Sequence, residues 1–168
     1  MTAEAEGPDL IDRLAGIAPA SPLALLRRQR PDIRAHIQGA YDALVDPPDP
    51  GHVSHAERAA IALRVARIER DETFTAHFRA VLDAAGASDL VAAAEGAASG
   101  SPRLDALLAF TDLVTSTPDR ADAREMARLR GFGLDARDIV AVTQLIAFMT
   151  YETRVLAGLR ILKQEAAR

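Results

Sequence analysis

The sequence has no cysteine, no tryptophan and a single lysine, Lys163. Without cysteine, the chain forms no disulfide, has no thiolate to bind a metal and runs no thiol redox cycle of its own. Its basic residues form no block along one face, and the net charge is −4. These features differ from the basic patch of a nucleic-acid-binding protein, so we expect no nucleic-acid partner.

Aromatic residues are also scarce, at 4% of the chain, whereas hydrophobic residues make up 49%. A core must therefore be built mainly from Ala, Leu, Ile and Val, which suits closely packed helices. A chain of 168 residues is long enough to bury a sizeable core in one domain. The composition predicts a folded protein rather than a disordered one.

The sequence lacks the features of an exported or membrane-spanning protein. Its start, "MTAEAEGPDL", is acidic and has no apolar segment of the kind found in signal peptides. The longest uncharged apolar run, residues 139–151, is shorter than the roughly 20 residues that cross a bilayer. We expect a cytoplasmic protein with no membrane partner.

Helix-start patterns recur along the chain, and the apolar residues between them follow a helical period. Ser54 with Glu57 forms an S-x-x-E capping box. Further N-caps are predicted at Ser21, Asp71, Ser101, Asp122 and Asp135. The sequence predicts an all-α, single-domain bundle of seven or eight helices. We expect a mobile tail at residues 1–7, a tail and short helix over residues 1–19, and the helical domain over residues 20–168.

One predicted helix has polar residues on a side that should face the core. In "RDETFTAHFRAVL", which begins at Arg70, His77 falls in helical register with Phe74 and Phe78. Thr73 lies one turn before His77 and Arg70 about two turns before it, so we expect all three on one side. A buried histidine needs a hydrogen-bond partner. This stripe is either a site or a satisfied part of the core.

Other polar residues give weaker indications. Glu57 and Glu69, on the preceding helix, are possible partners for His77. No His-x-x-x-His or Glu-x-x-His pair lies on the His77 face, so we expect no metal. Glu152 and Arg154 interrupt the apolar final helix. We favour a solvated or intrahelical charge pattern, or a subunit contact, over a pocket role for these two.

Two segments resemble a known superfamily. The segment "HAERAAIALRVARIERDETFTAHFRAVL" resembles the core of the carboxymuconolactone decarboxylase and alkylhydroperoxidase D superfamily, in which an Ala-rich helix precedes a C-x-x-C-x-x-x-H motif. The segment at residues 107–159 is similar to the peroxidase-related branch. The resemblance covers roughly residues 20–162 and implies an alkylhydroperoxidase D-like helical domain. Members are typically oligomers, and helices this apolar would expose patches alone, so we expect a homo-oligomer.

The resemblance assigns motif positions but not the motif's chemistry. His77 falls on the motif histidine, whereas Thr73 and Arg70 fall where the two cysteines would be. Arg58, beside Glu57, falls about where the peroxidases have a proton-relay glutamate. In those enzymes one cysteine thiolate attacks the peroxide and the second resolves the product. Threonine and arginine do neither, so the resemblance does not imply a thiol peroxidase.

The decarboxylase branch needs no cysteine, and it keeps an H-x-R-A-x-L pattern that begins here at His77. We therefore expect a cofactor-free lyase or isomerase that acts on a small carboxylate. In this hypothesis His77 donates a proton, Arg70 binds the carboxylate and Glu57 orients the reacting groups. Thr73 and Arg58 are the candidate substrate-binding residues. The alternative is a non-catalytic, ligand-binding or structural oligomeric relic of the fold.

The missing cysteines lead to a direct prediction. The purified protein should not reduce hydrogen peroxide at the expense of a thiol, because none of its side chains can form a sulfenic acid. Peroxide consumption in the presence of dithiothreitol should equal that of a sample without protein. A rate that rises with protein concentration and persists after removal of trace metals would contradict this expectation.

Overall fold

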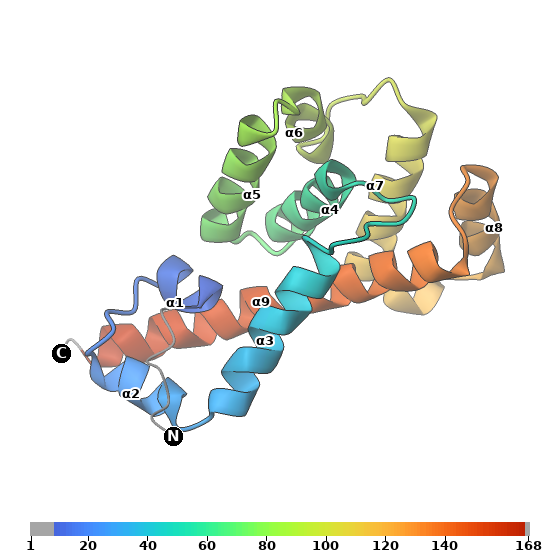
Figure 1. The fold of residues 1–168 in the computed structure, drawn as a ribbon. Coiled ribbons are helices and arrows are strands. Elements are labelled where there is room, and N and C mark those ends of the chain that lie inside the picture. The colour runs from blue at the N-terminus through green and yellow to red at the C-terminus, as the bar shows by residue number, and fades with distance from the viewer. Residues whose placement is uncertain (1–8, 167–168) are drawn as a thin grey trace.

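The computed structural model describes residues 9–166, which form α-helices joined by short turns and contain no strand (Figure 1). The expected tail at residues 1–7 lies outside this range. The elements are α1 (Leu10–Leu14), α2 (Pro22–Arg28), α3 (Pro31–Leu44), α4 (His55–Ile68), α5 (Glu72–Ala84), α6 (Ser88–Ala94), α7 (Pro102–Ser116), the 3-10 turn η1 (Pro118–Arg120), α8 (Ala123–Gly131) and α9 (Ala136–Glu165). The all-α prediction is confirmed. Residues 9–166 contain nine α-helices, whereas seven or eight were predicted. The short helices α1, α2 and α6 are separate elements in this number.

The predicted caps account for where the helices begin. The Ser54 hydroxyl accepts a hydrogen bond from the Glu57 backbone N–H, and the Glu57 carboxylate accepts one from the Ser54 backbone. Asp135 and Asp138 form a second capping box at the start of α9. These reciprocal bonds satisfy backbone donors that the first helical turn leaves unpaired. The remaining predicted caps also accept from the first turn of their helices: Ser21, Asp71, Ser101 and Asp122.

Helix α4 forms the centre of the core and packs against α5, α6, α7 and α9. Half of its buried residues are alanine, which lets neighbouring helices approach closely. Larger side chains from the surrounding helices fill the space around these alanines. The fully buried core includes Ala60, Ile61, Leu63, Phe74, Phe78, Leu107, Leu145, Ile146 and Met149.

Helix α9 runs the length of the molecule, with α4 to α7 on one side and the N-terminal helices near its C-terminal end (Figure 1). Within residues 9–166 it is the one helix long and apolar enough to cross a membrane. Its buried face packs in the core through Val142, Leu145, Ile146, Met149 and Leu156. A core helix meets the same length and composition test, so this property does not indicate a membrane.

A cluster of ion pairs joins α1, α2 and α3. Arg27 and Arg34 each contact both Asp9 and Asp12, and these four side chains are only 8–10% exposed. Burial alone would raise the pKa of Asp9, but the Asp12 N–H and the two guanidinium groups outweigh it and lower that pKa. The N-terminal helices are therefore held together by charges that compensate one another.

Candidate functional site

His77 lies where α5 meets α3, and it is half-buried. Its Nε2 atom is 3.1 Å from the hydroxyl oxygen of Tyr41 on α3. The imidazole also packs edge-on against Phe78, with ring centroids 4.9 Å apart. The histidine therefore has a hydrogen-bond partner, but this is Tyr41 rather than Glu57 or Glu69.

The surroundings of this pair keep both side chains neutral near pH 7. Burial lowers the pKa of His77, and the positive charge of Arg13 on α1 lowers it further. Burial raises the pKa of Tyr41 to about 12, with smaller contributions from Asp46 and Asp42. Two neutral groups, each able to donate or accept a proton, thus lie side by side.

Arg70 does not lie on the His77 face of α5, so that expectation is wrong. It occupies the turn between α4 and α5, where its φ of 58° is left-handed and its side chain is exposed. Asp71 then caps α5 and starts a new helical direction. The spacing argument counted Arg70 in the helical register of α5, although the predicted cap at Asp71 places Arg70 before the helix. Arg70 instead borders a small cavity of about 110 Å³ with Arg67, Glu72 and Thr75.

Thr73 lies in the first turn of α5, one turn before His77, as expected. Its hydroxyl accepts a hydrogen bond from Arg160 on α9. The same guanidinium forms an ion pair of 2.6 Å with the buried carboxylate of Asp71. Thr73 is therefore half-buried and engaged in the contact between α5 and α9, which differs from its predicted role as a substrate-binding group.

Glu57 lies at the start of α4 and is engaged on two sides. Its carboxylate completes the capping box with Ser54 and forms an ion pair of 2.9 Å with Arg103 on α7. These contacts position the start of α4 against α7. They leave Glu57 paired with groups other than His77.

Arg58, next to Glu57, is buried and only 3% exposed. Its guanidinium donates to three backbone carbonyls, those of Leu44 at 2.8 Å, Pro50 at 2.9 Å and Val53 at 3.0 Å. All three belong to the end of α3 or to the proline-rich connection that follows it. Arg58 thus holds this connection onto α4, and its predicted role in substrate binding is replaced by a structural one.

We predict that Arg58→Met lowers the free energy of unfolding by about 3 kcal/mol, because three buried or part-buried carbonyls lose a charged donor. Urea denaturation followed by circular dichroism measures this loss. The control is Arg154→Met, since the Arg154 side chain is 73% exposed and its loss should change stability by less than about 0.5 kcal/mol. Equal effects of the two substitutions would contradict the role given to Arg58.

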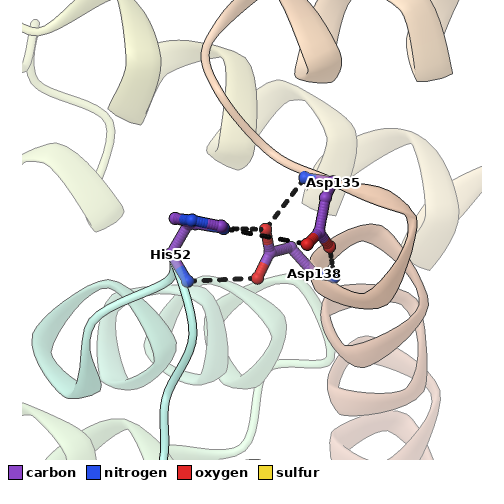
Figure 2. A group of neighbouring side chains, drawn as sticks. All are labelled: His52, Asp135 and Asp138. Carbon is purple, nitrogen blue, oxygen red and sulfur yellow. Dashed lines mark hydrogen bonds and ion pairs between the residues drawn. The ribbon is translucent and has the colours of Figure 1, made fainter.

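A group of three side chains, His52, Asp135 and Asp138, presents donor atoms within 4.8 Å of one another where the proline-rich connection meets the start of α9 (Figure 2). The Asp138 carboxylate is 3% exposed and lies 2.8 Å from His52 Nδ1. It also accepts from the backbone N–H of His52 at 3.1 Å and of Asp135 at 2.9 Å. These residue types could bind a divalent cation.

The buried member of this group, Asp138, already accepts hydrogen bonds from His52 and Asp135. Burial alone would raise the pKa of Asp138, but the N–H groups of Asp135 and His52 outweigh it and lower that pKa. Gly51 has a φ of 64°, and a Cβ atom there would lie 2.8 Å from the Asp138 carboxylate. A structural role therefore accounts for the three residues: their hydrogen bonds hold the proline-rich connection against the start of α9.

Glu152 on α9 is a buried carboxyl group that the sequence did not indicate. It is only 2% exposed, whereas a solvated or intrahelical charge pattern, or a subunit contact, was expected for it. Its Oε1 atom is buried and has no hydrogen-bond partner within the described part of the chain. The pKa of Glu152 is raised to about 7, mainly by burial and also by the charge of Asp9, whereas Arg27 partly opposes the rise. Arg154, in contrast, is exposed as expected.

We predict that Glu152 makes stability depend on pH. The folded protein holds this proton more tightly than the unfolded chain, whose glutamate pKa is near 4.5. Its contribution to stability is therefore complete below pH 4.5 and is lost as pH rises to about 7. A pKa difference of this size corresponds to about 3 kcal/mol.

Glu152→Gln removes this titration and tests it. Relative to the unaltered protein, the variant should gain about 3 kcal/mol of stability between pH 4 and pH 8. Denaturant unfolding of both proteins at each pH measures the difference and cancels the other titrating groups. A difference that stays constant over this range would show that Glu152 titrates normally.

No protein-family model matches the chain, and a search of curated proteins finds no match.

Proposed function

We propose that the chain is a cysteine-free relative of the carboxymuconolactone decarboxylase and alkylhydroperoxidase D superfamily, and that it is a cofactor-free lyase or isomerase acting on a small carboxylate. The proposal depends on one observation, the 3.1 Å hydrogen bond between His77 and Tyr41 across the contact of α5 and α3. His77 is also the residue that matches the motif histidine of the superfamily.

The two groups suit a proton transfer at carbon. A neutral imidazole can remove a proton from the carbon next to a carbonyl, or return one to it. A neutral tyrosine hydroxyl, whose pKa here is about 12 for Tyr41, can donate a hydrogen bond to the oxyanion that forms. In the tautomer with the proton on Nε2, His77 donates to the Tyr41 hydroxyl oxygen. The Tyr41 proton is then free for the oxyanion, and Nδ1 of His77 is free to take or return the proton at carbon.

A carboxylate substrate also needs a cation, and Arg70 lies on a separate turn. Arg13 on α1 is the better candidate, because its charge is close enough to lower the pKa of His77 and to oppose the rise in that of Tyr41. An arginine can hold a carboxylate by two parallel hydrogen bonds. In this arrangement α1, α3 and α5 each supply one group.

A second candidate function is a ligand-binding or structural relic of the fold. The structural roles of Arg58 and Glu57, and the position of Arg70 in the turn before α5, favour it. In this case His77 and Tyr41 serve only to join α5 to α3. The two functions differ in whether replacing His77 changes a chemical rate.

Deuterium exchange tests the proposal without knowledge of the natural substrate. A panel of keto acids and lactone carboxylates is incubated with the protein in D₂O, and NMR follows deuterium entry next to the carbonyl. We predict catalysed exchange for at least one compound, and a loss of at least about 100-fold in His77→Gln, as for removal of a general base. Tyr41→Phe should reduce the rate by about 10-fold or more.

The control for this experiment is His36→Gln, which removes an exposed histidine of α3 and should leave the rate unchanged. Circular dichroism confirms that each variant is folded. Exchange that survives in His77→Gln would exclude His77 as the base. Saturable binding of a panel compound without exchange would favour the relic.

A further inference from the structure

The carboxyl group of Glu152 is buried close to the N-terminal helices. Two charges act on it, those of Asp9, which caps α1, and of Arg27 on α2. Its Oε1 atom is the one buried side-chain oxygen or nitrogen in residues 9–166 that has no hydrogen-bond partner. A buried carboxyl without a partner is much less costly when it is protonated than when it is charged. The surroundings of Glu152 therefore suit the neutral form and disfavour the ionised one.

The ion pairs of the N-terminal helices do not compensate a charge on Glu152. Asp9 and Asp12 contribute two negative charges to their cluster. Arg27 and Arg34 contribute two positive charges, so the cluster is neutral as a whole. The effect of Asp9 on Glu152 exceeds the opposing effect of Arg27. An ionised Glu152 would therefore be a third carboxylate beside two guanidinium groups, without a counter-charge of its own.

Charges on α9 and on the other helices around it are also arranged in pairs. These pairs are Arg154 with Glu69, Arg160 with Asp71, Arg64 with Asp112, and Arg103 with Glu57. His77 on α5 is neutral near pH 7, because burial lowers its pKa. A negative charge on Glu152 is therefore relieved by exposure to water rather than by a neighbouring cation.

The N-terminal layer, which comprises α1, α2 and α3, is buried less deeply than α4. One of the 14 residues of α3, Arg34, is buried, compared with eight of the 14 residues of α4. Helices α1 and α2 have only five and seven residues. Segments with few buried contacts open locally, without unfolding of the whole domain. The ion pairs join the three helices to one another, so the layer can separate from α9 as one body.

We propose that Glu152 is a pH-dependent switch that controls whether the N-terminal layer lies on α9. When Glu152 is protonated the layer is closed, and when Glu152 is ionised the layer opens and brings the carboxylate into water. Opening separates Tyr41 on α3 and Arg13 on α1 from His77 on α5. Control of catalysis by this step rests on the proposed function, whereas the opening itself does not.

The closed and open states differ in the pKa of Glu152. This pKa is about 7 in the closed state and near 4.5 once the side chain is exposed. The closed state is therefore fully favoured below pH 4.5, and this preference is lost as the pH rises to about 7. For this difference, the equilibrium constant for opening should increase about 200-fold between pH 4 and pH 8.

Hydrogen exchange of the full chain, followed by mass spectrometry at pH 4 and pH 8, tests the opening. Protection factors are compared, since they exclude the pH dependence of the chemical exchange step. Amides of the N-terminal layer should be at least about tenfold less protected than those of α4 at both pH values, because they open without global unfolding. Their protection should nevertheless decrease about 200-fold from pH 4 to pH 8.

Glu152→Gln should abolish this decrease, because the amide has the shape of the protonated carboxyl and does not titrate. Glu152→Met, which removes the polar group, should do the same and serves as a second variant. Glu165→Gln is the matched control, since Glu165 is an exposed glutamate of the same helix, and it should behave like the unaltered protein. Circular dichroism confirms that each variant is folded.

Deuterium exchange into a panel compound tests whether the switch controls the candidate site. The rate with Glu152→Gln, relative to that with the unaltered protein, should be near one at pH 5 and greater than one at pH 8. An equal ratio at both pH values would show that the layer does not control the site. If no compound exchanges, the proposed function fails, and the protection factors still decide whether the switch exists.

Three results on protection would overturn the proposal. A layer as well protected as α4 opens only when the whole domain unfolds. Protection of the layer that is independent of pH shows that Glu152 stays covered when the layer moves. A decrease that persists in both Glu152→Gln and Glu152→Met assigns the pH dependence to another group.

Discussion

The buried carboxylate of Asp71 determines where the candidate site lies. It caps α5 through the Phe74 backbone N–H at 2.8 Å and pairs with Arg160 of α9 at 2.6 Å. The cap fixes the residue at which α5 begins, and the ion pair fixes the rotation of α5 relative to α9. His77 lies fewer than two turns further along α5, so these two contacts direct its ring toward Tyr41.

The buried charges of the protein differ in how far they are compensated. Asp9 and Asp12 are each paired with two arginines, and Arg58 donates to three carbonyls. Removing a charge from water is costly unless such partners are present. Glu152 lacks them on Oε1 and instead holds a proton at a higher pH. Its protonation state therefore changes near neutral pH.

The sequence predicted the local features of the fold well and the long-range features poorly. Capping boxes and helical periodicity depend on residues within one or two turns, so the all-α class and the helix starts could be predicted. The error at Arg70 arose because the spacing argument extended the helical period back past the predicted cap at Asp71, into a turn where Arg70 is left-handed. The Tyr41 partner of His77 depends on the packing of two helices, and Tyr41 looks like any residue of an apolar face. Burial of Glu152 likewise depends on how α1 to α3 pack on α9, which short sequence intervals do not record.

The inner side of α9 connects the candidate site with the buried charges of the N-terminal helices. Glu152, Leu156 and Arg160 follow one another at intervals of four along it. Arg160 pairs with Asp71, the cap of α5, whereas Glu152 is influenced by the charges of Asp9 and Arg27. One side of one helix therefore contacts both the cap of the helix that carries His77 and the N-terminal ion pairs. A substitution at Arg160 should act on the first of these contacts, and a substitution at Glu152 on the second.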